Sequence, residues 1–264
     1  DYKDLTNPKN DFPSSRLRRK ISSDIGKRTY SARSLHGLVV HELGLRIVSG
    51  QIAEGEVLPI ETQLGAEFEV SRTALREGIK VLTAKGLLVS RTRTGTRVRP
   101  RSDWNMLDPD VLAWRLETHH DAEFAQDLYD FRMAIEPMAA SLAAERASDE
   151  QIEEMKAALA DMRAAGLDSK AFIEPDLRFH QTLLTACRND LLASLSALIE
   201  TALSFSFNQS DLVMTEKIAD VHDDVFFAIR DRDAQAAHAA MVTLINCSRD
   251  INKALLKKIS DESA

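Results

Sequence analysis

Hydrophobic residues between positions 58 and 85 recur at the spacing of two short helices joined by a tight turn. Leu64 and Phe68 share one side of the first predicted helix. Leu75, Ile79 and Leu82 follow at intervals of three or four residues in the second, which predicts one buried stripe. The pattern therefore predicts a helix-turn-helix.

The second helix of this pair also has a polar, basic side. Ser71 opens the helix, where its hydroxyl can accept a hydrogen bond from a backbone N–H of the first turn. Arg72, Arg76 and Lys80 are spaced four apart and form a row about 100° round the helix from the apolar stripe. Such a helix suits the major groove of DNA, with arginine contacting a guanine edge or the backbone. The alternative is an amphipathic helix whose basic side is merely solvated.

The flanking residues complete a small DNA-binding fold. A helix is predicted from about 35 to 49, and Gly50 ends it. Residues 86–100 predict two short strands around an Arg93-Thr94-Gly95 turn. A hairpin placed directly after a helix-turn-helix is a wing, and four arginines would let it contact a minor groove or a phosphate ridge: Arg91, Arg93, Arg97 and Arg99.

The remainder of the chain shows helical spacing and no strand pattern. The longest predicted helix, 122–146, carries apolar residues at alternating intervals: Leu128, Phe131, Ile135, Met138 and Leu142. A short helix around Trp114 precedes it, and five follow at about 149–165, 168–188, 190–208, 214–231 and 233–257. We therefore expect a mainly α protein. Three helices and a β-hairpin wing form the N-terminal winged helix-turn-helix, and an all-α bundle of six to seven helices follows.

Charge is distributed unevenly along the 264 residues. Residues 1–101 carry 19 Lys and Arg against 11 Asp and Glu, a balance of +8. Residues 102–264 carry 15 against 30, a balance of −15, which completes the net charge of −7. A nucleic-acid surface is therefore expected in the N-terminal part, because the acidic remainder would repel phosphate. Residues 1–33 are polar, contain a basic cluster and predict a flexible basic arm.

Composition narrows the class of protein further. There is no run of about 18 apolar residues, as a membrane span requires, and no apolar secretory segment near the start. The two cysteines, Cys187 and Cys247, form no metal-ligand pattern and no disulfide framework. We expect a cytoplasmic protein with reduced thiols and no membrane partner.

Polar residues in the helical part form candidate sites. Asp176 and His180 are four apart and share a helix face, and His222 lies on a separate predicted helix. A carboxylate and imidazoles in this arrangement can chelate one divalent metal. Arg132 lies one turn before Glu136 on the inner side of the long helix and requires an anionic partner. The alternatives are a surface Asp–His pair or a satisfied core histidine, and a structural ion pair at Arg132.

The N-terminal part, from about residue 35 to 100, resembles the winged helix of the GntR family of bacterial transcription regulators. The matching residues are Gly50, Gly55, Leu58-Pro59, Glu61, Leu64, Ser71-Arg72-Thr73, Leu75-Arg76-Glu77, Leu82, Gly86-Leu87-Leu88 and Gly95-Thr96. The resemblance implies that Ser71, Arg72, Thr73 and Arg76 contact operator DNA, with the wing glycine Gly95 close to the duplex. Arg91 and Arg93 of the wing are expected to contact DNA because of their charge.

Two positions depart from the family pattern. Thr62 stands where many members carry a DNA-contacting Arg, and the wing tip has Arg93-Thr94 where Gly-Arg is usual. These departures affect the details of the operator. They do not remove the expectation of DNA binding.

Residues 122–255 resemble the FCD ligand-binding domain of the FadR-type subgroup. The resemblance rests on Arg132-x3-Glu136-Pro137, on Asp176-x3-His180, and on His222 leading into Ala228-Ile229. It implies a helical bundle in which Asp176, His180 and His222 hold a divalent metal, commonly zinc or nickel. A small carboxylate effector would then bind the metal and pair with Arg132.

The third histidine of the family site is replaced. The alignment places Leu244 there, and His238 is six residues earlier and points about 120° away. Three ligands can still hold zinc with oxygens in the open positions. The alternative is that the trio hydrogen-bonds a polyhydroxy acid directly, without metal. The run from Trp104 to Trp114 further resembles the branch that includes the galactonate-operon repressor, which suggests a sugar acid as effector.

The sequence therefore predicts a ligand-responsive repressor rather than an enzyme. It would bind a pseudo-palindromic operator as a homodimer and release it when a small organic acid binds. Residues 34–100 would bind DNA, and residues 101–264 would bind the effector and dimerise. The alternatives are a metal-dependent enzyme that uses the Asp–His trio, and an architectural DNA-binding protein without an effector.

Overall fold

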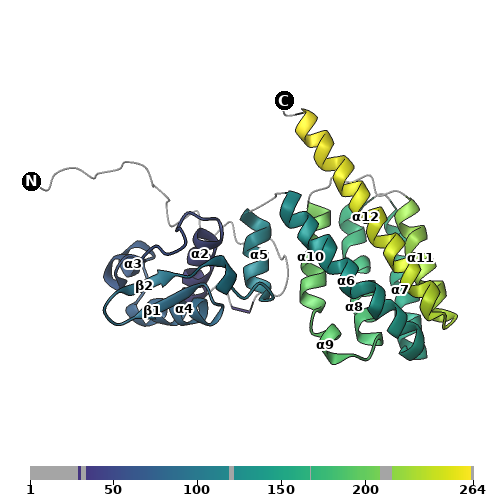
Figure 1. Ribbon diagram of the computed structural model, residues 1–264, viewed down its shortest axis with the longest axis horizontal. Helices are drawn as coiled ribbons and strands as arrows, with labels where there is room; N and C mark the ends of the chain where they lie inside the picture. Colours follow the sequence, from purple (N-terminus) through teal and green to yellow (C-terminus); the bar gives the residue numbers. More distant parts are fainter. Residues whose placement is uncertain (1–28, 31–33, 119–121, 167, 209–215, 263–264) are drawn as a thin grey trace, which may run out of the picture. The chain divides into compact units, whose positions relative to one another are not determined.

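The computed structural model describes residues 29–30, 34–118, 122–166, 168–208 and 216–262 (Figure 1). The chain divides into two compact units, Asp1–Asn105 and Met106–Ala264, and each unit is described by itself. The predicted arm at residues 1–33 lies outside the described part, except for Thr29 and Tyr30. Within the described residues, no helix is long and apolar enough to cross a membrane.

The N-terminal unit is a winged helix-turn-helix, as predicted. Helices α2 (Leu35–Val48), α3 (Glu61–Glu67) and α4 (Arg72–Ala84) precede the antiparallel strands β1 (Leu88–Arg91) and β2 (Gly95–Val98). Leu88 pairs with Val98 and Arg91 with Gly95, so the turn of the wing is three residues long. An isolated antiparallel bridge between Val57 and Arg97 adds a short extended segment to the hairpin.

Leucine side chains from all three helices and the wing form the core of this unit. Leu43, Leu64, Leu75, Leu82 and Leu88 are at most 2% exposed. They remove apolar area from water and thereby orient α4 with its basic side outward.

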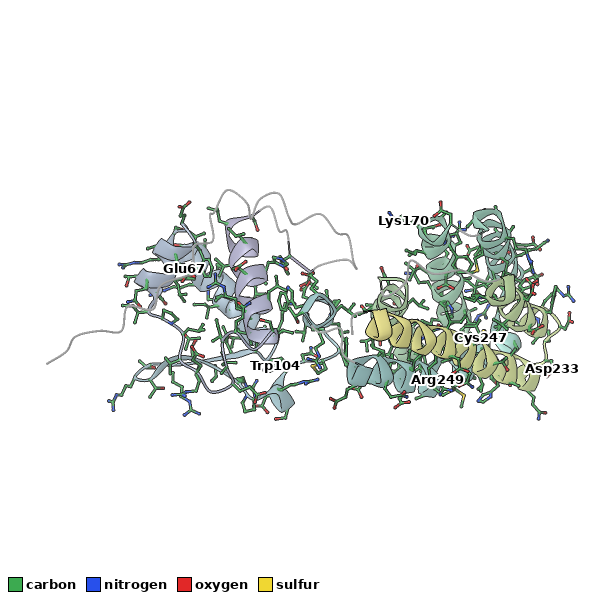
Figure 2. The ribbon with its side chains drawn as sticks, turned by 90° about the horizontal axis from the view of Figure 1, so that it is seen from above. Glu67, Trp104, Lys170, Asp233, Cys247 and Arg249 are labelled. Carbon is green, nitrogen blue, oxygen red and sulfur yellow. The ribbon has the colours of Figure 1, made fainter. Side chains whose placement is uncertain are left out.

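After the wing, the chain passes close to the C-terminal end of α4. Gly86 has φ +81, and a Cβ there would lie 2.5 Å from the Asp103 carbonyl oxygen, so only glycine fits. Asn105 N donates to Lys85 O at 3.0 Å. The indole Nε1 of Trp104, labelled in Figure 2, donates to Arg99 O at 3.0 Å. These contacts tie the short helix η1 (Arg101–Asp103) to the end of α4 and to the wing.

Every described element of the C-terminal unit is a helix, which confirms the predicted all-α architecture. The helices are α5 (Pro109–Thr118), α6 (Ala122–Arg146), α7 (Asp149–Ala165), α8 (Ser169–Ala186), α9 (Asp190–Ala193), α10 (Ser196–Asn208), α11 (Glu216–Arg230) and α12 (Ala234–Glu262). The helix predicted at 190–208 is in fact two, because Ser194 ends α9 and its hydroxyl donates to Leu191 O. Capping explains other boundaries: Ser148 forms a capping box at α7, and Asp168 caps α8.

The inward face of α6 differs from the predicted apolar stripe. Of the apolar residues in that stripe, Leu128 is buried, Phe131, Ile135 and Leu142 are half-buried, and Met138 is 53% exposed. The buried face instead carries small residues and one ion pair: Ala139, Ala140, Ala143, Ala144, Arg132 and Glu136. Alanines allow neighbouring helices to approach α6 closely, and Arg132 and Glu136 lie on the inner side of the helix, as predicted.

The buried ion pair of α6 predicts a specific pattern of mutant stability. Arg132→Met should lower the free energy of unfolding by about 3–5 kcal/mol, because it leaves the Glu136 carboxylate buried without its cation. The double variant Arg132→Met/Glu136→Leu should recover most of that loss, because it removes both charges. Urea denaturation of the full chain at neutral pH, followed by far-UV circular dichroism, measures both effects.

The matched control is Arg163→Met, because Arg163 pairs with Asp220 and Asp223 at the exposed surface. It should change stability by less than about 1 kcal/mol. A single Arg132→Met variant as stable as this control would contradict the prediction.

Candidate DNA-contacting surface and buried ligand site

Helix α4 has the two-sided character that its sequence predicts. Ser71 is its N-cap, and the hydroxyl accepts a hydrogen bond from Ala74 N at 3.2 Å. Leu75, Ile79 and Leu82 are buried, which anchors the helix to the unit. Its first turn is exposed, so the backbone N–H groups at that end can approach a phosphate.

The polar residues nominated for DNA contact are all at the surface, but their side chains are not equally available. Thr62, Arg72 and Thr73 are exposed, and Arg72 has no acidic partner among the described residues. Arg76 donates from Nε to both carboxylate oxygens of Glu61, at 2.9 and 3.0 Å. The sequence pattern did not reveal this pair, because its members are 15 residues apart on different helices.

The four wing arginines also divide into two groups. Arg97 donates to the Gly55 carbonyl, and Arg99 lies 3.1 Å from Asp103, so both hold the hairpin to neighbouring backbone and side chains. Arg91 and Arg93 are exposed and have no acidic partner within the described part of the chain. All four were expected to contact nucleic acid, and within the described residues Arg91 and Arg93 have their whole guanidinium groups available for it.

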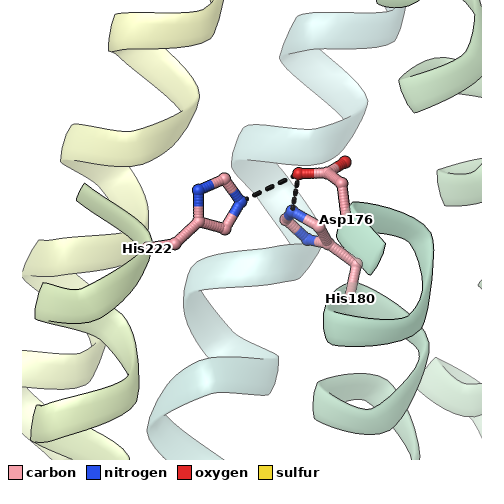
Figure 3. A group of neighbouring side chains, drawn as sticks. All are labelled: Asp176, His180 and His222. Atoms are coloured by element: carbon pink, nitrogen blue, oxygen red, sulfur yellow. Dashed lines mark ion pairs between the residues drawn. The ribbon is translucent and has the colours of Figure 1, made fainter. Parts of the chain in front are cut away.

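A cluster of buried ionisable residues lies inside the C-terminal unit. Asp176 and His180 project from α8, and His222 projects from α11 toward them (Figure 3). The Asp176 carboxylate oxygen Oδ1 is 2.9 Å from His222 Nε2 and 3.9 Å from His180 Nε2. The three side chains are at most 4% exposed. The fold therefore brings together the trio that the sequence pattern selected from two helices.

The cluster extends to Arg132 and Glu136 on α6. Glu136 accepts from Arg132 Nε at 2.6 Å, and its other oxygen lies 2.7 Å from His180 Nδ1. Both side chains of the ion pair are at most 1% exposed. Glu136 was paired only with Arg132 in the sequence analysis. Its contact with His180 depends on the packing of α6 against α8, which periodicity within one helix does not encode.

Aromatic rings enclose the imidazole of His222. The Phe179 ring meets it edge to face at 5.3 Å between centroids, and Phe172 does so at 6.2 Å. The other ring nitrogen of His222, Nδ1, lies 2.7 Å from the Ile218 carbonyl oxygen and donates to it in the matching tautomer. That tautomer leaves the Nε2 lone pair directed at the cluster, as a metal ligand or hydrogen-bond acceptor requires.

Neighbouring side chains keep the buried carboxylates ionised. Burial alone would raise the pKa of Glu136, but Arg132 and His180 lower it to about 2. Burial would also raise the pKa of Asp176, but His222 and His180 hold it below its ordinary value. A depressed carboxyl pKa stabilises the fold above the ordinary value of 4.5, and for Glu136 this stabilisation is lost as pH falls toward about 2.

Several buried polar atoms of the cluster have no aligned hydrogen-bond partner within the described residues. They are Arg132 Nη1, Asp176 Oδ2, His180 Nδ1, His180 Nε2 and His222 Nε2. Two of these nitrogens lie close to a carboxylate oxygen: His180 Nδ1 is 2.7 Å from Glu136, and His222 Nε2 is 2.9 Å from Asp176. Buried polar groups are normally satisfied, so the arrangement indicates a site built for a ligand.

The donor set fits a divalent metal. One oxygen from Asp176 and one nitrogen each from His180 and His222 lie within 4.8 Å of one another. Donors that share one ion at about 2.0–2.2 Å are themselves about 3–4 Å apart, and imidazole with carboxylate suits zinc or nickel. Leu244 is buried in the apolar core of the unit, and His238 is exposed on α12. Neither adds a fourth protein ligand.

Comparisons with known proteins agree with this architecture. Residues 36–98 match the family described as bacterial regulatory proteins, gntR family, and residues 127–246 match the FCD domain. The solved structure of Lar, which controls expression of the Listeria monocytogenes agr system, aligns over 86% of this chain and all of its own. Its TM-score is 0.58 at 18% identity, which supports the fold alone.

Curated relatives carry the same two parts. The galactonate operon transcriptional repressor of Escherichia coli K12 is 36% identical over 80% of this chain and 93% of its own length. The regulator YieP of the same organism is 33% identical over 81% and 93%. The repressor NanR of Cronobacter sakazakii is 30% identical over 86% and 88%. These relatives are transcription regulators and not enzymes, which rejects the enzymatic alternative. The chain belongs to the GntR family of bacterial transcription regulators and carries an FCD effector-binding domain.

Proposed function

We propose that this regulator is a homodimeric repressor that releases its operator when a small carboxylate binds the buried cluster. Residues 34–100 form the DNA-binding domain, and residues 101–264 form the effector-binding and dimerisation domain. The observation that carries the effector part is the fully buried cluster around Asp176, whose nitrogen and oxygen atoms lack aligned partners. A domain that only held two copies together would have no need of such a cluster.

The DNA-contacting surface combines the first turn of α4 with the wing. Arg72 and Arg76 are placed to contact base edges, and Ser71 and Thr73 to contact phosphates beside the helix N-terminus. Thr62, Arg91, Arg93 and Gly95 complete the surface, with the wing arginines directed to a groove or phosphate ridge. Two copies related by a two-fold axis would bind a pseudo-palindromic operator. The outward apolar side chains of α6, Met138 among them, offer surface to a second copy.

Formal charge supports a metal together with one carboxylate. Arg132 contributes +1, while Glu136 and Asp176 contribute −1 each, so the buried cluster sums to −1 with neutral imidazoles. When bound, a divalent ion would supply two positive charges and open coordination positions, bringing the sum to +1. One effector carboxylate then brings it to zero. Without the ion, the carboxylate would add to an uncompensated negative charge, which is costly in a buried site.

The effector in this proposal is a monoanionic sugar acid. Arg132 Nη1 is a buried donor without a partner in the described residues and is available for a carboxylate or hydroxyl oxygen. The name of the Escherichia coli galactonate operon repressor, the relative at 36% identity, identifies an aldonate as the acid to test first. Binding would favour a dimer arrangement that no longer fits the spacing of the operator half-sites, which couples the two sites through differential affinity.

Arg72→Ala should weaken binding to the operator by about 1–3 kcal/mol and reduce its salt dependence, because one cation leaves the interface. Fluorescence anisotropy with labelled operator at several salt concentrations measures both quantities. The matched control is Lys170→Ala, which removes an exposed positive charge from α8 in the other unit, at the site labelled in Figure 2. Equal effects of the two substitutions would contradict the proposed surface.

Zinc-loaded protein should melt at a higher temperature when galactonate is added, because the acid binds the folded state. Galactarate has the same carbon skeleton and a second carboxylate. It should raise the melting temperature less, because the additional negative charge would be uncompensated in the site. Galactose, which has no carboxylate, should have no effect. Thermal-shift measurements together with metal analysis by mass spectrometry follow these differences.

The response to galactonate should disappear after removal of metal and in His222→Ala. The matched control Asp161→Asn changes an exposed carboxylate on α7 that pairs with Arg178, and it should respond as the unmodified protein does. A full galactonate response in metal-free protein would refute the metal, and equal responses to galactonate and galactarate would refute the charge argument.

A further inference from the structure

The ion pair between Arg76 and Glu61 joins the two helices of the helix-turn-helix. Glu61 is the first residue of α3, and Arg76 lies in the second turn of α4. The Arg76 Nε donates to both carboxylate oxygens, at 2.9 and 3.0 Å. Both side chains remain accessible, at 65% exposed for Arg76 and 40% for Glu61. The pair therefore lies on the surface that is proposed to meet DNA.

The pairing leaves the far end of the guanidinium free. Within the described residues, no acceptor or acidic group contacts Arg76 Nη1 or Nη2. A guanine presents O6 and N7 as two adjacent acceptors in the major groove, and an arginine fork matches them. With Nε held by Glu61, only the end-on approach through Nη1 and Nη2 remains for Arg76. The Glu61 carboxylate thus leaves Arg76 with one of the several ways in which a guanidinium can approach a guanine.

The other basic residues of α4 lack this restraint. Lys80 pairs with Glu77 one turn away on the same helix, at 2.8 Å, and Arg72 has no acidic partner in the described part of the chain. A Lys–Glu pair within one helix does not relate α4 to α3. Arg76 is therefore the cation of this helix whose direction is set by a different element.

We propose that Glu61 is a positioning residue that orients Arg76 for end-on recognition of one operator base pair. The inference rests on the proposed function, in which Arg76 contacts the operator. An arginine side chain loses rotamer entropy on binding, and holding it in place beforehand reduces that cost for the matching base. The Glu61 carboxylate also repels phosphate, so it lowers affinity for DNA of any sequence. Glu61 therefore lowers the affinity for DNA of any sequence and raises the preference for the operator over other sequences.

The fold does not depend on the pair. Exposed ion pairs contribute little to stability, and the packing of α3 on α4 is provided by Leu64 and Leu75, which are at most 2% exposed. Substitution of Glu61 should therefore leave the winged helix folded, and a thermal melt of each variant checks this.

The test compares Glu61→Gln with Glu77→Gln and Arg76→Ala in the full chain. Each protein is titrated with the operator and with a scrambled duplex, and its preference at each base pair is obtained by selection from a randomised operator. Glu61→Gln should lower the ratio of operator affinity to scrambled-duplex affinity roughly tenfold, the size of one lost specific contact. Its affinity for the scrambled duplex should stay equal or rise, because a negative charge has been removed.

Position-by-position preferences distinguish positioning from a general structural role. Glu61→Gln and Arg76→Ala should lose preference at the same base pair and keep it elsewhere, and Glu61→Asp should restore part of it because the charge is retained. Glu77→Gln removes an equal charge from α4 and should leave all preferences unchanged.

Two outcomes would overturn the inference, and they separate it from the proposed function. If Arg76→Ala loses the preference and Glu61→Gln keeps it, Arg76 contacts a base without help from Glu61. If both variants keep every preference, Arg76 is not a base contact at all. A loss in Glu61→Gln spread evenly over all base pairs would assign Glu61 to the structure of the domain, and that result also refutes positioning.

Discussion

The ion pair between Arg132 and Glu136 is the interaction on which the C-terminal unit depends most. Both side chains are almost completely buried, so each charge requires the other to remain ionised in a medium of low polarity. Glu136 also contacts His180, and His180 lies beside Asp176. The ion pair on α6 therefore contributes charged groups to a cluster whose other members come from α8 and α11. The ligand site is therefore part of the core, and any change in its charge is a change in the stability of the bundle.

Sequence periodicity predicted the helices well, because an amphipathic helix buries one face wherever it is placed. It misassigned part of α6, where Met138 is 53% exposed and the buried face consists of alanines beside the predicted Arg132–Glu136 pair. An average over hydrophobicity cannot identify such a face, since the buried charges lower its apparent apolarity. The pairing of Asp176 with His180 followed from their spacing on one helix. The approach of His222 depended on how α11 packs against α6 and α7, and only the resemblance to a known domain supplied it in advance.

At the proposed DNA-contacting surface, too, the sequence does not reveal contacts between residues that are far apart along the chain. Composition indicates that the N-terminal part is basic, but it does not show which cations are already occupied. Arg97 is held by a carbonyl 42 residues away, and Arg76 by a carboxylate 15 residues away. These partners become neighbours only through the tertiary fold. Fewer arginines at this surface are without a partner than the sequence suggests, and a partner such as Glu61 restricts the direction from which its arginine can contact the operator.

The two arginine–glutamate pairs of this protein have the same chemistry and opposite roles, and solvent decides between them. Around Glu136 water is excluded, so loss of one partner leaves a buried charge and destabilises the unit. Around Glu61 water screens both groups, so the pair adds little stability and can be altered without unfolding the domain. The exposed pair still controls the direction of the Arg76 side chain, because its Nε–H is shared between both carboxylate oxygens of Glu61. Substitutions at the exposed Arg76–Glu61 pair can therefore change DNA specificity without unfolding the domain. At the buried Arg132–Glu136 pair, a substitution that removes one charge alone destabilises the unit.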